Sequence, residues 1–190
     1  MSTPPLYLLR HGQTDWNRDM RVQGQMESDL TELGRGHAVR QGEILAALDL
    51  PAGIAAYCSP QRRTRQTAEL ALGPLGITPA FDDRLKEIYL GHWEGHLYAE
   101  MKAKDPAAFE GLTPLELLLF GPGESEADMR ARLGAFVKEI TAPAIVVSHG
   151  IALTILRAEV LGGGMDEMEA MGREQGVVYE LRDGEEIVHR

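Results

Sequence analysis

The chain has 190 residues, which is enough for one domain with a well-buried core. Hydrophobic residues make up 44% and charged residues 25% of the sequence, proportions that are typical of folded proteins and argue against disorder. The 29 acidic and 19 basic side chains give a formal net charge of -10, which disfavours nucleic acid and anionic membranes as partners. We expect one domain over residues 1–190.

Features of exported and membrane-embedded proteins are missing from the sequence. Cys58 is the single cysteine and has no partner for an internal disulfide. No charged and apolar signal is visible near the N-terminus, and no apolar run reaches the length of a membrane span. We expect a cytoplasmic protein that is a monomer or a homodimer.

The first predicted strand covers Pro5–Leu9, a short apolar run followed at once by Arg10 and His11. Polar residues therefore begin where this strand ends. The apolar spacing over Thr31–Leu48 then predicts an amphipathic helix. A second buried strand is expected over Ile54–Cys58.

A helix is predicted directly after this second strand. Ser59 and Pro60 are typical of an N-cap and a first turn, and the helix should run to about Leu75. If the helix starts at Ser59, Arg63 lies on its apolar stripe and points inward, whereas Arg62 points outward.

Ser125 and Asp128 form the cap signal of a further helix that ends near Ile140. A third strand over Ala144–Ser148 follows, and then an apolar helix that reaches Val160 and stops before a run of glycines.

Near the C-terminus, Val177–Leu181 and Glu186–Val188 are separated by Asp183 and Gly184 and predict a terminal hairpin. The alternation of strands and helices indicates an α/β layered fold, and the hairpin indicates a mixed sheet.

One segment allows two interpretations. Gly111–Gly123 contains two prolines and an apolar patch at Leu115–Phe120. Such a segment is typical of a mobile lid or a partner surface, and equally of a helix packed on the core.

Polar side chains follow three of the predicted strands. Ligands of open α/β sheets bind beyond the carboxyl ends of the strands, and Arg10, His11, Arg63, His149 and Gly150 would converge there. A guanidinium group matches phosphate oxygens and stays charged, so two arginines at this edge predict a phosphate pocket. A buried ion pair is the alternative interpretation of Arg63 taken alone.

A neutral imidazole can attack phosphorus and form a covalent intermediate, and His11 and His149 are the candidates. The other histidines lie in a predicted amphipathic helix, beside a Trp-Glu-Gly loop or at the C-terminus. Arginines, a second histidine and the Gly150 N–H would neutralise the equatorial phosphoryl oxygens without a metal.

The leaving alkoxide needs a proton, and Glu87 is a candidate general acid, although an acidic residue there is also typical of a solvated surface. Competing chemistries fail on spacing. No Gly-x-x-x-x-Gly-Lys-Ser/Thr loop is present, and Thr64 stands where a cysteine phosphatase built on Cys58 needs an arginine. His92 and His96 lack the glutamate of a zinc metalloprotease helix. We expect no metal and no cofactor.

Four sequence blocks, in this order, resemble the histidine phosphatase superfamily in its phosphoglycerate mutase-like branch. The blocks are Leu9–Asn17 with its Arg-His-Gly motif, Ser59–Ala68, Glu87–Gly95 and Val147–Gly150. The resemblance covers nearly the whole chain. It implies a three-layer α/β/α sandwich with a mostly parallel mixed sheet.

The resemblance also implies roles for individual residues. It implies a phosphohistidine at His11, a pocket made by Arg10, Arg63 and His149, and Glu87 acting first as acid and then as base. Further positions that line the same site in relatives are Asn17, Gln23 and Gly24.

The resemblance leaves the reaction open. A mutase must hold a second anionic group, yet the small cap expected around 95–123 is short, mostly acidic or apolar, and has only His96, Lys102 and Lys104 as basic residues. We therefore expect a metal-independent phosphatase that hydrolyses a small phosphorylated metabolite, similar to the broad-specificity and α-ribazole phosphatases. The alternatives are a cofactor-dependent phosphoglycerate mutase and a non-catalytic module that binds a phosphorylated ligand or docks a partner.

Overall fold

Strand β1 (Leu6–Arg10) lies inside a six-stranded sheet of order β3-β2-β4-β1-β5-β6. The computed structural model describes residues 3–104 and 106–190; residues 1 and 2 of the expected domain and Asp105 of the expected cap lie outside the described residues. The other strands are β2 (Ala55–Cys58), β3 (Ala80–Phe81), β4 (Ala144–Ser148), β5 (Val178–Arg182) and β6 (Glu185–His189).

The sheet is mixed and mostly parallel, as predicted. β1 runs parallel to β4, and β2 runs parallel to both β4 and β3, whereas β5 and β6 are antiparallel to their neighbours. The terminal hairpin is confirmed, with Asp183 and Gly184 in the left-handed conformation of its turn. Arg10 is paired with Ser148, so the carboxyl ends of β1 and β4 lie side by side.

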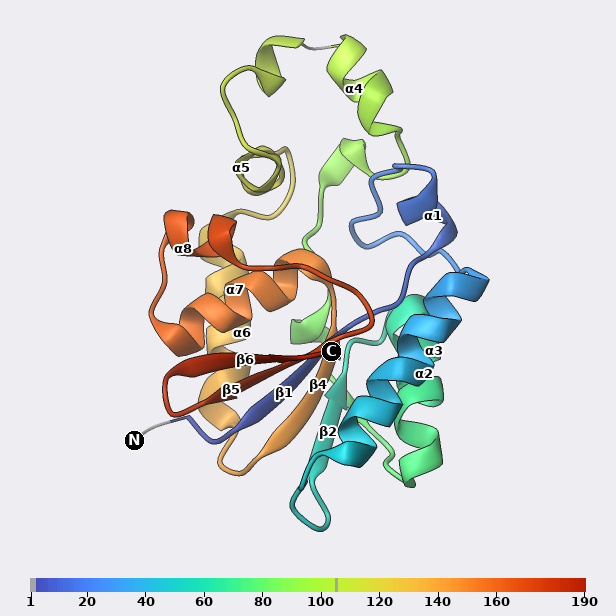
Figure 1. Cartoon of the computed structure of the whole chain (residues 1–190). Coiled ribbons are helices and arrows are strands. Elements are labelled where there is room, and N and C mark those ends of the chain that lie inside the picture. Colours follow the sequence, from blue (N-terminus) through green and yellow to red (C-terminus); the bar gives the residue numbers. More distant parts are fainter. Residues whose placement is uncertain (1–2, 105) are drawn as a thin grey trace.

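Helices cover both faces of the sheet (Figure 1). Helices α6 (Glu126–Glu139) and α7 (Gly150–Leu161) pack on one face, and α2 (Glu32–Ala47) and α3 (Arg62–Leu72) pack on the other. Within the described residues, no helix is both long and apolar enough to cross a membrane.

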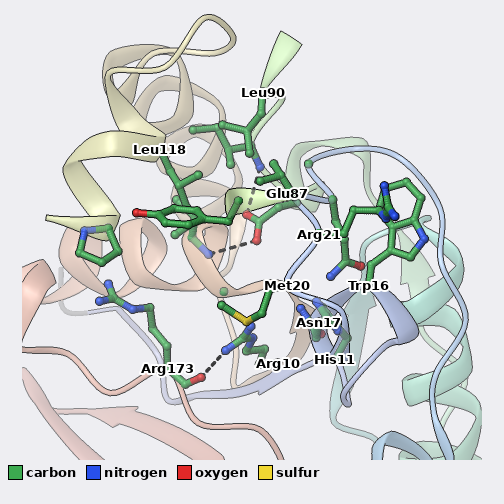
Figure 2. Close-up of a pocket in the computed structure, with 18 of the residues that line it drawn as sticks. Arg10, His11, Trp16, Asn17, Met20, Arg21, Glu87, Leu90, Leu118 and Arg173 are labelled. Carbon is green, nitrogen blue, oxygen red and sulfur yellow. Dashed lines mark hydrogen bonds between the residues drawn. The ribbon is translucent and has the colours of Figure 1, made fainter. Parts of the chain in front are cut away.

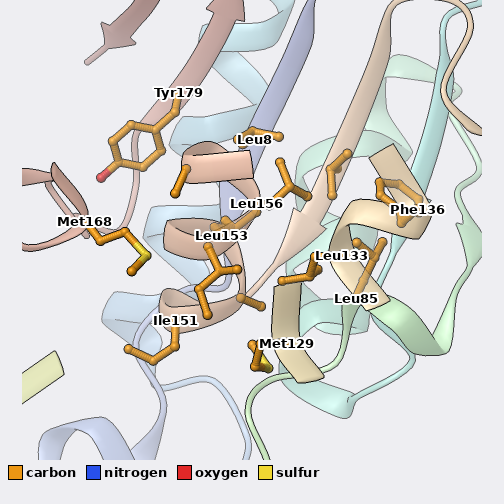
Figure 3. Packing of buried hydrophobic residues seen from close by; sticks show 14 of the residues in the cluster. Leu8, Leu85, Met129, Leu133, Phe136, Ile151, Leu153, Leu156, Met168 and Tyr179 are labelled. Carbon is orange, nitrogen blue, oxygen red and sulfur yellow. The ribbon is translucent and has the colours of Figure 1, made fainter. Parts of the chain in front are cut away.

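The alternation of side chains along β1 builds two separate cores. Leu6 and Leu8 join the cluster beneath α6 and α7, which Figure 3 shows, whereas Tyr7 and Leu9 join the cluster beneath α2 and α3. The predicted three-layer sandwich is therefore confirmed.

The predicted helix starts are confirmed at two places and wrong at one. Thr31 caps α2 and Ser125 caps α6 with their side chains. The predicted cap at Ser59 is wrong, because α3 begins at Arg62 and its N-cap residue is Gln61. Ser59 is fully buried, and its hydroxyl lies 2.8 Å from a histidine side chain and accepts from Gln61 N at 3.5 Å.

The segment at 95–123 forms α4 (Tyr98–Lys104), a 3₁₀ turn (Pro106–Phe109) and α5 (Pro114–Leu119), which lie beyond one end of the sheet at the top of Figure 1. Leu115 and Leu119 are buried in the same core cluster as α6 and α7, whereas Phe120 is exposed. Of the two interpretations of this segment, a helix packed on the core describes α5. The remaining helices are α1 (Asp15–Arg18) and α8 (Met165–Ala170).

Candidate active site

A cavity of about 500 Å³ opens beyond the carboxyl ends of β1 and β4 (Figure 2). Eight of the nine predicted site residues line it: Arg10, His11, Asn17, Gln23, Gly24, Arg63, Glu87 and Gly150. The ninth, His149, is fully buried and is not part of the cavity wall. Residues that are far apart in the sequence therefore meet at one edge of the sheet, as the strand ends predicted.

His11 directly follows β1, and its backbone N–H continues the pairing of β1 with β4 by donating to Ser148 O at 3.0 Å. Its ring Nδ1 lies 2.8 Å from Gly12 O. A carbonyl only accepts, so Nδ1 carries the hydrogen and Nε2 keeps the lone pair. Burial, followed by the charges of Arg63 and Arg10, holds the pKa of His11 well below 6.5. The imidazole is therefore neutral at pH 7.

Two glycines allow the loop after β1 to lie directly against the first turn of α2. A Cβ atom at Gly12 would lie 2.0 Å from Gly34 O, and one at Gly34 would lie 1.9 Å from Gln13 O. Both backbones therefore need residues without side chains at this contact. The close approach fixes the loop that carries His11.

The two arginines are held in different ways. Arg63 is fully buried, and its guanidinium donates from Nη1 to Met26 O at 2.9 Å and from Nη2 to Gly24 O at 2.8 Å. Arg10 donates from Nη1 to Arg173 O, and its buried Nε has no hydrogen-bond partner within residues 3–104 and 106–190. Burial lowers the pKa of Arg10 and lowers that of Arg63 to about 10, so both remain charged at pH 7.

The inward orientation predicted for Arg63 is confirmed, and its neighbour Arg62 is exposed. Helical spacing placed Arg63 correctly even though α3 begins three residues later than predicted.

His149 lies behind His11, with the two ring centroids 5.2 Å apart. Arg63 Nε donates to its Nδ1 at 3.1 Å, and its Nε2 lies 2.8 Å from Ser59 Oγ. Burial, followed by the charge of Arg63, holds the pKa of His149 well below 6.5, so this ring is also neutral.

Glu87 lies in a stretch without helix or strand, and its carboxylate accepts hydrogen bonds from the N-terminus of α7. Oε1 accepts from Ala152 N at 2.9 Å and from Ile88 N at 3.0 Å, and Oε2 accepts from Ile151 N at 3.2 Å. Free N–H groups at a helix N-terminus favour a negative charge. Glu87 thus lines the same cavity as Arg10 and His11, as Figure 2 shows.

The remaining predicted residues are also tied to the site. Asn17 closes the capping box of α1 through Thr14, and Gln23 Oε1 accepts from Thr14 Oγ1 at 3.1 Å. Gly24 has a φ of 51°, and a Cβ atom there would lie 2.0 Å from Glu94 Oε1. Gly150 lies against the Arg10 guanidinium, since a Cβ atom at Gly150 would lie 3.3 Å from Arg10 Nε.

The comparison with known proteins decides the family. The sequence pattern of the histidine phosphatase superfamily (branch 1) matches residues 6–186. This chain belongs to that superfamily. It is therefore a histidine phosphatase family enzyme with the phosphoglycerate mutase-like fold.

Relatives in this superfamily carry more than one name. Glucosyl-3-phosphoglycerate phosphatase of Mycobacterium tuberculosis is 35% identical over 182 residues, which cover 88% of this chain and 79% of the relative. A protein of Erwinia tasmaniensis named "Probable phosphoglycerate mutase GpmB" is 34% identical over 164 residues, which cover 83% and 74% of the two chains. The structure of Bacillus stearothermophilus YhfR is similar with a TM-score of 0.81 and 33% identity, covering 97% and 95%.

Several residues of the site were not found from the sequence. Gln61 and Ser59 belong to the second family block, but their side-chain partners lie in distant loops. Arg21 and Arg173 also line the cavity, and both lie outside the segment 95–123. Gln175 donates to His11 O at 3.0 Å and to Asn17 Oδ1 at 3.3 Å. The polar residues 172–176, just before the hairpin, were the sequence feature that could have indicated Arg173 and Gln175.

The two additional arginines already have partners. Arg21 donates to Gly95 O and stacks on Trp16, 5.6 Å from the ring centroid. Arg173 Nη2 lies 3.5 Å from Glu169 Oε2. Among the residues that the structure describes, no three His, Cys, Asp or Glu side chains are grouped as ligands of a metal ion would be.

Proposed function

We propose that this superfamily member is a phosphatase that hydrolyses small phosphomonoesters in two steps, with His11 as the nucleophile. The observation that carries the proposal is the state of His11. Its Nδ1 is hydrogen-bonded to Gly12 O, its ring is neutral at pH 7, and it lies in the cavity wall with the guanidinium groups of Arg10 and Arg63. A neutral nitrogen with its lone pair free is the form of histidine that attacks phosphorus.

In the first step, His11 Nε2 attacks the phosphorus atom and the bond between phosphorus and the ester oxygen breaks. Arg10 and Arg63 neutralise the charge on the equatorial oxygens, and the unpaired Arg10 Nε supports an anion at this place. Glu87 acts as the general acid and donates a proton to the departing alkoxide. The products are a phosphohistidine and a free alcohol.

In the second step, the Glu87 carboxylate takes a proton from water while the oxygen of that water attacks the phosphorus atom. The bond between phosphorus and Nε2 breaks, inorganic phosphate leaves, and His11 returns to its neutral form. The His149 ring packs against the His11 ring and accepts a hydrogen bond from Arg63. The phosphate-binding wall of the cavity is completed by Gly150, Asn17, Gln23 and Gly24.

The far wall of the cavity supports a leaving group that is partly apolar. Leu90, Pro114, Leu115 and Leu118 line it from the segment that we propose as a cap, around 95–123, and from the stretch that leads to it. The relative named glucosyl-3-phosphoglycerate phosphatase supports hydrolysis of a phosphorylated metabolite rather than phosphate transfer between two positions.

The proposal is tested with p-nitrophenyl phosphate in the presence of EDTA. We expect the protein to release p-nitrophenol, and a rapid acid quench should trap one acid-labile phosphoryl group per chain. His11→Ala should lose both signals. His92→Ala, which changes an exposed histidine outside the cavity wall, should keep them. Full turnover by the His11 variant would overturn the nucleophile assignment.

The two alternatives have their own outcomes. With 3-phosphoglycerate and a 2,3-bisphosphoglycerate primer, isomerisation faster than phosphate release would mean that the enzyme is a mutase and not a phosphatase. Turnover no faster than solution hydrolysis on a panel of sugar phosphates, phosphoglycerates, nucleotides and α-ribazole phosphate would replace it by a non-catalytic phosphate-binding module.

A further inference from the structure

Gln61 is the N-cap residue of α3, yet its side chain makes no hydrogen bond to the helix. The side chain is 3% exposed and extends to two other parts of the chain. Its Oε1 accepts from Glu87 N at 2.9 Å, and its Nε2 donates to Gly24 O at 3.4 Å. A buried amide with both ends paired across segments restrains the groups that it joins.

The peptide groups of Glu87 depend on such contacts because residues 87–90 form no helix or strand. The N–H of Glu87 is held by Gln61. The carbonyl of Glu87 accepts from Gln25 Nε2 at 3.0 Å and from Arg132 Nη2 at 3.3 Å. Side chains from three different segments therefore fix the backbone on which this carboxylate stands.

Gly24 O joins this arrangement to the phosphate side of the cavity. The same carbonyl accepts from Arg63 Nη2 at 2.8 Å and from Gln61 Nε2 at 3.4 Å. Gln61 is thus hydrogen-bonded both to the backbone of Glu87 and to Gly24 O, the carbonyl that also binds Arg63. A displacement of Glu87 relative to Arg63 would break one of these bonds.

We propose that Gln61 is a positioning residue that sets where the Glu87 carboxyl group stands relative to the phosphoryl group. This inference rests on the proposed function, in which Glu87 protonates the leaving alkoxide. Positioning matters because a displacement of about 1 Å costs on the order of a hundredfold in rate. Gln61 itself touches neither the phosphoryl group nor the leaving group in this role.

The test compares two substrates that differ in their need for an acid. The p-nitrophenolate ion leaves without a proton, whereas the alkoxide from glycerol phosphate needs one. The value of kcat/KM reports the step in which the leaving group departs. Gln61→Leu and Gln61→Asn both remove the reach of the amide, and the Asn variant keeps a polar group in case the Leu variant does not fold.

We expect both Gln61 variants to lower kcat/KM for glycerol phosphate about tenfold more than for p-nitrophenyl phosphate. Glu87→Gln should give a larger difference in the same direction. Gln66→Leu is the matched control, since this glutamine of the same helix accepts from Leu30 N at 3.0 Å, away from Glu87. Its effect on the two substrates should be equal.

Two results overturn the inference, and they differ in what they leave standing. If Glu87→Gln discriminates between the substrates and the folded Gln61 variants do not, Gln61 has no positioning role and the proposed function remains. If Glu87→Gln does not discriminate either, the acid role of Glu87 fails and the inference fails with it.

Discussion

Arg63 donates a hydrogen bond from Nε to Nδ1 of His149 at a distance of 3.1 Å. Because a guanidinium Nε always carries hydrogen, this contact makes Nδ1 the acceptor and leaves the ring proton on Nε2. Nε2 then donates to Ser59 Oγ at 2.8 Å. One arginine thereby sets the tautomer of His149 while its two terminal nitrogens bind Met26 O and Gly24 O.

Lysine cannot replace this arginine, because its three N–H groups share one nitrogen, whereas Arg63 donates from three separate nitrogens of a planar group. We expect Arg63→Lys to lower kcat/KM for p-nitrophenyl phosphate by about a hundredfold or more. Arg62→Lys is the matched control, because the Arg62 side chain is 58% exposed and should be replaceable without effect. Comparable losses in the two variants would refute a special role for Arg63.

Stability should depend on pH through the two buried histidines. The pKa values of His11 and His149 lie well below 6.5 in the folded protein, so the unfolded chain binds more protons just below that pH. The contribution of these two histidines to the free energy of unfolding should therefore be constant above 6.5 and fall as the pH drops toward the folded pKa values. Each histidine contributes up to about 1.4 kcal/mol per pH unit.

Denaturant titrations between about pH 7 and pH 5.5 measure this effect. His149→Gln should reduce the pH dependence by one histidine's share. An unaltered slope in His149→Gln would mean that His149 is not neutral in the folded protein.

The contact between Gly12 and Gly34 should tolerate no side chain. A Cβ atom at Gly12 would lie 2.0 Å from Gly34 O, and backbone cannot move aside cheaply. We expect Gly12→Ala to lower the free energy of unfolding by about 3 kcal/mol or more. Gly36→Ala, in α2 two residues after Gly34 and with open space around it, should instead stabilise by about 0.5–1 kcal/mol. Chemical unfolding separates the two results, and equal effects would contradict the packing argument.

Much of this fold follows from local patterns. Apolar runs that end in polar residues located β1, β2 and β4, and the meeting of their carboxyl ends placed Arg10, His11 and Gly150 together. The inward orientation of Arg63 followed from helical periodicity, which survives an error in the helix start because the spacing between residues of one face does not change.

The contacts of Ser59 and Gln61 lie outside the reach of such patterns. A serine before a proline is typical of an N-cap, but the side chain of Ser59 contacts His149, which follows the neighbouring strand β4, and α3 starts only at Arg62. Local propensity is decided within one turn of the chain, whereas these hydrogen bonds depend on His149, Gly24 and Glu87, which lie far from α3 in the sequence. The places of Arg173 and Gln175 at the site were not predicted for the same reason.

The place of β1 between β4 and β5 also bears on how the enzyme is made. Both partners of β1, the strand that leads into His11, lie far along the chain, at residues 144–148 and 178–182. Pairing between segments this distant in sequence closes long loops before contacts are gained, which slows folding. A chain cut before β5 should therefore lack the antiparallel neighbour of β1, and it should be inactive and dependent on chaperones.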